Sequence, residues 1–236
     1  MTIVSNNGFS KYPGKATPYF TEGRGGVAGE VAVLRADVAG YLGVSVVPVA
    51  DEWTDPPAAT ANGLKTAIAT VAAPVTYSGA DFNGALAAAP LNPPRPITIT
   101  TAGATPADAP ATAVITGTDV DGNVQSETVT VPQTATLVTT VKAYRTVTSI
   151  ALPAADGVAA TLAVGIAAPL GFSKKIKLRA GAAMLLAVTE AGTRINPGSF
   201  GTVTVPASMG PNGAFTPTSA ADGTRDYVVV FEPDNA

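Results

Sequence analysis

The sequence predicts a mainly β protein: an antiparallel β-sandwich of immunoglobulin-like or similar type, a further β-rich section, an extended N-terminal arm and little helix. Three observations predict this class. Short runs between residues 95 and 165 alternate Val, Ile or Ala with Thr, which is the period of strands with one buried face. An Asp-Gly pair within 119–123 supplies the positive φ angles of a tight hairpin. Residues 226–232 are rich in the β-branched and aromatic residues that favour a sheet interior.

Composition divides the 236-residue chain into four parts. Residues 1–26 are rich in turn signals and are expected to form the arm. Residues 27–93 predict a mixed section of strand and helix, and residues 94–166 hold the alternating runs of the sandwich. Residues 167–236 contain further strand-like runs, and we expect this C-terminal β section to pack with 27–93.

The arm concentrates aromatic residues in coil-like sequence, which is unusual for a flexible tail. Two interpretations stay open: the rings fold onto the arm's own domain, or they anchor the arm on a neighbouring subunit. Stacking on nucleic acid is a weaker third interpretation, because the sequence offers no basic groove beside the rings. With a nearby arginine and the single Trp of the chain, these residues form our candidate interface set: Phe9, Tyr12, Tyr19, Phe20, Arg24 and Trp53.

The section after the arm begins with apolar runs. Residues 29–35 and 41–47 are expected to be strands, and Pro48 limits the second of them. Trp53 lies in an acidic stretch just before Pro56-Pro57. We interpret that stretch as a boundary loop between domains.

Residues 58–73 are the best helix candidate in the chain. Leu64, Ile68 and Val71 lie at positions i, i+4 and i+7, and the proline that follows should end the helix. The next segment, 81–89, is expected to form another helical turn or a loop.

Five alternating runs predict the strands of the sandwich. They are 95–101, 113–118, 127–131, 144–150 and 162–165. The second and third are joined by Asp119-Val-Asp-Gly-Asn123, so we expect them to be antiparallel neighbours in a hairpin. None of the runs carries an obvious catalytic group, which favours a structural role in which the strands present a contact surface.

The C-terminal section predicts four further strands and one long loop. Strand-like runs occur at 174–179, 183–189, 202–205 and 226–232. Residues 208–223 are rich in Gly, Pro, Ser and Thr and predict the loop. The lysines within 174–179 alternate with apolar residues, so a solvated or interfacial strand is favoured over a phosphate contact.

The residue types that the chain lacks exclude several chemistries. It contains no His and no Cys, which removes the commonest general base, the commonest transition-metal ligand and all thiol chemistry. Charged residues make up 13% of the chain and the net charge is −3, so no basic footprint for nucleic acid is present. We therefore expect no enzymatic activity, no cofactor, no metal site and no nucleic-acid partner.

The sequence also gives expectations about location. The first seven residues lack the basic and apolar regions of a secretory signal. The apolar segment 157–172 is interrupted by Pro169 and three glycines, and it falls short of the roughly 20 residues that span a bilayer. We expect a protein that is made and assembled in a cytoplasm, without membrane contact.

One short motif partly matches a calcium loop. Asp119, Asp121 and Asn123 alternate as its ligands do, but Gly122 falls fourth and the twelfth position, Thr130, has no carboxylate. A hairpin turn is the favoured interpretation.

Three further motifs could belong to a phosphate-binding or catalytic site, but each lacks a feature that such a site needs. The glycine-rich segment 22–29 lacks the Gly-Lys-Ser/Thr ending of a phosphate loop. The carboxylates of 51–55 could act as a hydrolytic pair, but the aromatic-rich cleft of such sites is missing from the sequence. Ser78 and Ser208 have no His to activate them.

The middle of the chain contains an ordered set of four motifs: Pro94-Arg95 before Ile97–Thr100, then Ile115–Asn123, then Ser126–Thr128, then Lys142–Ile150. This set resembles a β-sandwich module of tailed-bacteriophage virion proteins. The match covers about a third of the chain. Insertion of 106–110 in the first loop and Pro132 after the third run depart from the pattern.

The resemblance implies a virion structural protein of the head-decoration, head-fibre or tail-associated type. We expect a capsid decoration or cement protein whose partners are the major capsid protein and copies of itself, as a homo-oligomer in the virion. A tail, neck or fibre component is the first alternative. A host-surface carbohydrate-binding or adhesive module is the second.

Overall fold

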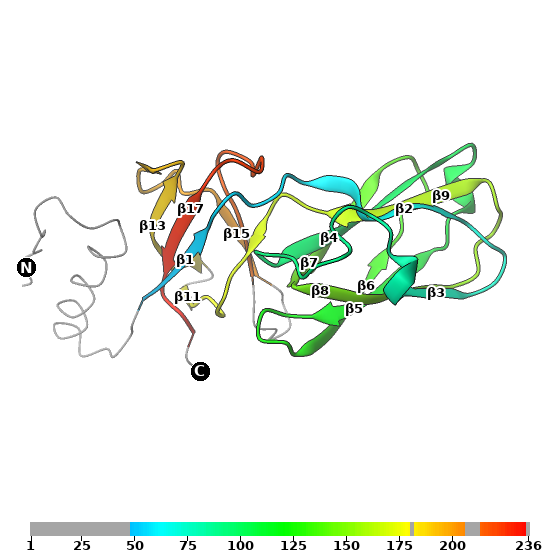
Figure 1. Cartoon of the computed structure of the whole chain (residues 1–236), viewed down its shortest axis with the longest axis horizontal. Coiled ribbons are helices and arrows are strands. Elements are labelled where there is room, and N and C mark those ends of the chain that lie inside the picture. The colour runs from blue at the N-terminus through cyan, green and yellow to red at the C-terminus, as the bar shows by residue number, and fades with distance from the viewer. Residues whose placement is uncertain (1–47, 180–181, 206–212, 235–236) are drawn as a thin grey trace, which may run out of the picture.

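The computed structural model describes residues 48–179, 182–205 and 213–234. The arm, the glycine-rich segment 22–29 and the predicted strands 29–35 and 41–47 lie outside the described residues. The described chain forms two β modules that follow each other along its long axis (Figure 1). We call them the sandwich module (60–166) and the terminal module (48–53 with 170–234).

The sandwich module consists of two four-stranded antiparallel sheets. The first has the order β2-β9-β4-β7 and the second the order β3-β8-β5-β6. Their bounds are β2 Thr60–Ala69, β3 Val75–Ser78, β4 Arg95–Gly103, β5 Thr112–Thr118, β6 Val124–Thr130, β7 Leu137–Tyr144, β8 Thr146–Leu152 and β9 Ala160–Ile166. The predicted mainly β class and the antiparallel sandwich are confirmed.

The strand order of this module is that of a jelly roll. The first strand pairs with the last (β2 with β9), the second with the second-last (β3 with β8), and so on inward to the β5–β6 hairpin. Rolling up this nested ribbon adds the pairs β4–β9 and β5–β8 and splits the ribbon into two sheets. The immunoglobulin-like variant of the prediction is therefore corrected, because that fold has a different strand order.

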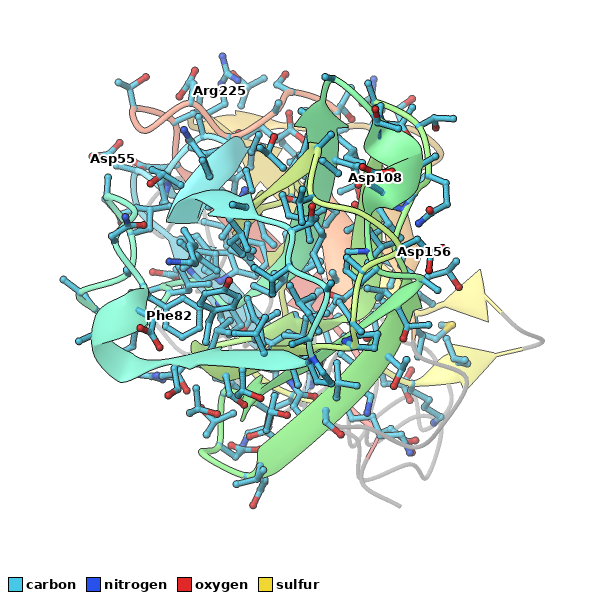
Figure 2. All side chains as sticks on the ribbon, turned by 90° about the vertical axis from the view of Figure 1, so that its right-hand side faces the viewer. Asp55, Phe82, Asp108, Asp156 and Arg225 are labelled. Atoms are coloured by element: carbon cyan, nitrogen blue, oxygen red, sulfur yellow. The ribbon has the colours of Figure 1, made fainter. Side chains whose placement is uncertain are left out.

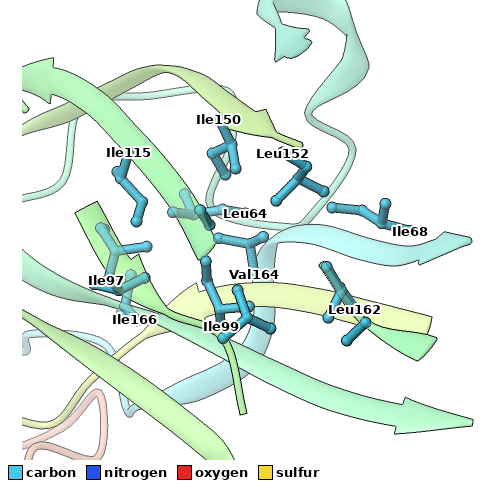
Figure 3. Packing of buried hydrophobic residues seen from close by; sticks show 14 of the residues in the cluster. Leu64, Ile68, Ile97, Ile99, Ile115, Ile150, Leu152, Leu162, Val164 and Ile166 are labelled. Atoms are coloured by element: carbon cyan, nitrogen blue, oxygen red, sulfur yellow. The ribbon is translucent and has the colours of Figure 1, made fainter. Parts of the chain in front are cut away.

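The core of the sandwich lies between the two sheets and is almost entirely aliphatic. Ile97 and Ile99 of β4 face Ile115 of β5 and Ile150 of β8, with Val164 beside them (Figure 3). These are the apolar positions of the alternating runs, so period two places them on the inner faces. Burying this surface is the main favourable term for the module.

The predicted helix at 58–73 is wrong, because these residues form β2 instead. Leu64 and Ile68 are buried in the sandwich core, as an inward face requires. A spacing of four is even, so it also fits the period of a strand, and short apolar spacings do not separate the two structures. Val71 lies beyond β2 and is exposed. Residues 81–89 form a loop after the short 3-10 turn Gly79–Asp81.

The terminal module contains two smaller antiparallel sheets and one short hairpin. The sheets have the orders β1-β17-β13-β14 and β10-β16-β15, and β11 pairs with β12. Their bounds are β1 Val49–Trp53, β10 Leu170–Gly171, β11 Leu178–Arg179, β12 Ala182–Ala183, β13 Leu185–Glu190, β14 Thr193–Arg194, β15 Thr202–Thr204, β16 Ala214–Thr216 and β17 Tyr227–Phe231. The prediction of an interior strand at 226–232 is confirmed, because β17 lies between β1 and β13.

Two predictions for the C-terminal section need correction. The loop predicted at 208–223 contains β16, whose Phe215 fills the module core and so orders this part of the segment. The strand predicted at 174–179 is reduced to β11 and one isolated bridge between Ile176 and Pro233, and Lys175 and Lys177 form ion pairs with Asp234 and Glu232.

The boundaries between the modules also differ from the prediction. Strands β2 and β3 of the predicted section 27–93 belong to the sandwich, which therefore begins near residue 60. In the described part of that section, β1 packs with the C-terminal residues through its pairing with β17, and the adjoining Asp55 and Pro56 hydrogen-bond to Asp226 and Gly223. The sandwich is thus inserted into the terminal module between β1 and β10. Among the described residues, no helix is long and apolar enough to cross a membrane.

Candidate interaction surfaces

Trp53 is part of the terminal core and is not available as a surface anchor. Its side chain is 7% exposed, and its ring lies 6.3 Å from the ring of Phe172 and 6.4 Å from that of Phe215, measured between centroids. Phe172 in turn lies 4.7 Å from Phe231. The alternation of β1 places Trp53 inward, which corrects our prediction of an anchor in a boundary loop. The other candidate anchors, Phe9, Tyr12, Tyr19, Phe20 and Arg24, lie outside the described residues.

The carboxylates of 51–55 do not form a hydrolytic pair. Asp51 points inward from β1 and accepts hydrogen bonds from the backbone N–H and the hydroxyl of Ser173, whereas Glu52 is exposed on the other face. Burial raises the pKa of Asp51 although the Ser173 hydrogen bonds and Lys174 oppose that shift. Asp55 lies beyond the strand, where its N–H donates to Asp226 at 3.2 Å.

The Asp119–Asn123 turn is stabilised by its own first carboxylate. Oδ1 of Asp119 accepts the N–H groups of Asp121 and Asn123, both at 2.9 Å, and Oδ2 accepts the Asn123 side-chain amide at 3.2 Å. This carboxylate is buried and already has these partners. The predicted β5–β6 hairpin is confirmed, and Gly122 supplies a positive φ of 86°.

The basic cluster at 174–177 is neutralised by acidic side chains. Lys175 lies 2.6 Å from Asp234 and Lys177 lies 2.6 Å from Glu232. Lys174 lies 3.6 Å from Asp121 and so joins the terminal module to the β5–β6 hairpin. A phosphate would have to compete with these carboxylates, so the cluster is better explained as structural.

Arg95 ties together the two segments that connect the modules. Its Nη1 donates to the carbonyl of Pro57 at 2.8 Å, on the incoming segment. Its Nε donates to the carbonyl of Ala167 at 2.9 Å on the outgoing segment, and Nη2 donates there and to Ala168 at 3.4 Å. The side chain is fully buried, which lowers the pKa of Arg95 to about 10 and leaves it charged at neutral pH. The planar guanidinium suits this task because its donors diverge in a fixed fork.

The outer face of the sheet β3-β8-β5-β6 carries hydroxyl and small apolar side chains and no charge. Cross-strand neighbours pair hydroxyl and small apolar side chains, for example Thr116 with Ser126 and Ser149, and Val114 with Thr128. We call this surface the threonine face. Its residues are half-buried or exposed: Thr76, Ser78, Thr112, Val114, Thr116, Thr118, Val124, Ser126, Thr128, Thr130, Ser149 and Ala151. Such a surface can be covered by a partner without desolvating any ion.

Side chains seal the edge between the two sheets at β6 and β7. The Glu127 carboxylate on β6 accepts the N–H groups of Val141 at 2.8 Å and Lys142 at 2.9 Å on β7. In return Lys142 donates to the carbonyl of Ser126 at 2.8 Å, and Gln125 donates to Ala143 at 2.7 Å. An edge strand with occupied N–H groups is protected from pairing with another chain. The sandwich is therefore more suited to face contacts than to edge contacts along this side.

A pocket of about 210 Å³ lies on the opposite edge, next to β2. Its lining combines apolar side chains with polar groups, and Arg145 is one of the lining residues. The loop 84–91 contributes lining residues and is fixed on both sides, because Leu86 N–H donates to the carbonyl of Gly63 at 2.7 Å and Leu91 N–H donates to the carbonyl of Arg145 at 2.7 Å. Between these bonds, 87–90 forms an arch. Figure 2 shows Phe82, another lining residue, on the opposite side of the module from Asp108 and Asp156.

Sequence reasoning missed the residues that organise these surfaces. Arg95 was part of the Pro-Arg motif, but only the fold shows that it meets both connecting segments. Arg145 has no distinguishing spacing, and Phe82 lies in a segment with no clear pattern. Within the described residues, no group of three or more acidic side chains could hold a metal ion. No protein-family model, curated protein or solved structure matches the chain.

Proposed function

We propose that the protein is a non-enzymatic structural protein of a tailed-bacteriophage particle that decorates or cements the assembled head. The ordered motifs between Pro94 and Ile150, which resemble phage virion modules, support the viral assignment. The jelly roll agrees with it, since this architecture occurs in viral capsid domains, although fold alone does not assign a function.

The observation that carries the mode of action is the threonine face. It offers an array of small uncharged side chains on a sheet whose β6–β7 edge is sealed. Contacts of this kind are weak one by one, but symmetry repeats them on a shell and linked contacts gain avidity. A protein that binds only the assembled shell stabilises it by mass action. The partners in this proposal are the major capsid protein and further copies of the chain.

Occupancy on particles tests the proposal. Thr128→Arg places a charge on the threonine face, where it is exposed on β6, and Ala107→Arg adds the same charge to an exposed loop outside the face. We expect Thr128→Arg to reduce the copies bound per particle at least about tenfold, which corresponds to about 1.4 kcal/mol. Equal occupancy of both variants would remove the face from the mechanism, and failure of the wild-type chain to bind particles would refute the function.

The arm makes a separate contribution in this proposal. Its aromatic residues Phe9, Tyr12, Tyr19 and Phe20, with Arg24, are the anchors that we expect outside the described modules. Deletion of residues 2–26 should lower capsid occupancy, and circular dichroism of the purified chain verifies that the remaining residues are folded. Undiminished occupancy would show that the arm is not an anchor.

One observation favours a second candidate, an adhesive or carbohydrate-binding module. Jelly rolls also occur in lectin domains. A glycan array that gives reproducible, competable binding to the purified chain would favour this candidate over decoration.

A further inference from the structure

The pocket beneath the 87–90 arch has the form of a socket for one large side chain. Its volume of about 210 Å³ is below the range of roughly 300–1,000 Å³ that is usual for small-molecule sites. The apolar part of its lining comes from three different parts of the module: Leu64 on β2, Phe82 and Leu86 on the loop, and Val147 on β8. Because backbone hydrogen bonds fix the arch at both sides, the socket exists before any ligand enters.

Arg145 gives this socket a charge preference. Its side chain is exposed, and its guanidinium forms no hydrogen bond or ion pair with the described residues. The lysines at 174–177, by contrast, all have acidic partners. An occupant that places a carboxylate next to its apolar side chain would satisfy both the walls and the guanidinium.

The chain itself contains one segment with this chemistry outside the described residues. Among residues 1–47, Tyr19 and Phe20 are the only aromatic residues within three positions of an acid, which is Glu22. The 28 Cα–Cα steps from Phe20 to Pro48 span up to roughly 90 Å when extended. A compact chain of 236 residues has a radius of gyration of roughly 18 Å. The segment is therefore long enough to reach this pocket on its own or a neighbouring copy.

We propose that the pocket is the docking site of the arm segment Tyr19–Glu22, with an aromatic ring under the arch and the Glu22 carboxylate on Arg145. This inference uses the pocket and the arm alone. It is independent of the virion role, so either proposal can fail without the other.

Cross-linking tests the docking, because the chain contains no native Cys. The test variant carries Thr21→Cys, between Phe20 and Glu22, and Ala88→Cys on the exposed arch. In each of two matched controls, one of the two cysteines is moved. The first control combines Ala88→Cys with Ser10→Cys, which lies next to Phe9 in the arm. The second combines Thr21→Cys with Ala107→Cys, which adjoins Asp108 on the opposite side of the module (Figure 2). We expect the test disulfide to form at least about tenfold faster than either control. The size of the cross-linked band shows whether the arm docks within one copy or between two.

A charge swap tests the ion pair. In the full-length Thr21→Cys, Ala88→Cys chain, Arg145→Glu should slow cross-linking about fivefold, the scale of an exposed ion pair. Combining it with Glu22→Arg should restore the rate. Circular dichroism and the melting temperature verify that each variant is folded. Cross-linking rates that match the controls, or a rate that Arg145→Glu leaves unchanged, would overturn the proposal.

Discussion

Arg95 is the residue on which the geometry of the junction depends most. Its guanidinium is the hydrogen-bond donor to three carbonyl groups on two segments that are far apart in sequence. Removing it takes the side-chain donor from the buried carbonyl of Ala167 and from the half-buried carbonyls of Pro57 and Ala168, and a buried acceptor left without a partner costs roughly 1–3 kcal/mol. A single side chain therefore holds together the two segments that connect the modules.

We expect Arg95→Ala to lower the free energy of unfolding by about 3 kcal/mol or more. Arg95→Lys should recover only part of this loss, because an ammonium lacks the planar fork that reaches both segments. Urea denaturation measures both variants. Arg194→Ala is the control, since this side chain is exposed, and it should change stability by less than about 0.5 kcal/mol. A loss for Arg95→Ala as small as that of the control would contradict the assigned role.

Asp51 should make the free energy of unfolding decrease as the pH rises, whereas a salt-bridged acid makes it increase. Burial raises its folded-state pKa above the ordinary value of 3.8, so the ionised form is penalised in the folded protein. Its stabilising contribution is complete below the unfolded-state pKa and is lost as the pH rises through the folded-state pKa. The difference in unfolding free energy, wild type minus Asp51→Asn, should therefore fall with increasing pH.

Urea denaturation from about pH 3 to about pH 8 measures this difference. Any constant offset from the altered hydrogen bonds to Ser173 cancels, because only the slope with pH is compared. A difference that rises with pH would mean that Ser173 and Lys174 stabilise the carboxylate more than burial destabilises it.

At the scale of elements, the sealed edge between β6 and β7 is the feature with a measurable consequence. Glu127 occupies two N–H groups of β7 that would otherwise be free to pair with another chain. Glu127→Ala should cost only about 1 kcal/mol of stability but should increase aggregation clearly. Light scattering during incubation below the melting temperature measures the aggregation. Glu52→Ala, on the exposed face of β1, is the control and should aggregate like the wild type.

The elements also show which sequence patterns were sufficient. Ile97, Ile99, Ile115 and Ile150 were placed correctly on inner faces, because each lies in a run that alternates without interruption. Strand β7 was missed because an irregularity near Thr98 shifts its register with β4 and breaks the alternation. Strand β2 was mistaken for a helix because its two inward residues are four positions apart and its pairing with β9 is irregular.

At the scale of the whole molecule, the sandwich is an insertion in the terminal module. Both described ends of the chain, residues 48 and 234, belong to the terminal module, and the sandwich extends away from it (Figure 1). The threonine face therefore lies on the module that extends away from both described ends of the chain (Figure 1).

Because the sandwich is an insertion, we expect it to fold as an isolated fragment, whereas the C-terminal part of the terminal module should not. Residues 55–169 retain every strand of the jelly roll and all partners of Arg95, so this fragment should fold cooperatively. Residues 170–236 lose β1, the neighbour of β17, and Trp53 from the core, so this fragment should not fold. Circular dichroism and thermal unfolding of the two fragments measure this. A cooperative transition in 170–236 alone would contradict it.

The sequence by itself determined the β class, the hairpin at Asp119–Asn123 and the inward residues of the regular strands, because these follow from local periodicity and turn chemistry. It also excluded thiol and histidine chemistry by composition. Only the tertiary structure decided that the strands nest into a jelly roll, that Trp53 is buried, that Arg95 joins two connecting segments and that Arg145 lines a pocket. Each of these depends on contacts between residues distant in the chain, and a local pattern carries no record of such partners.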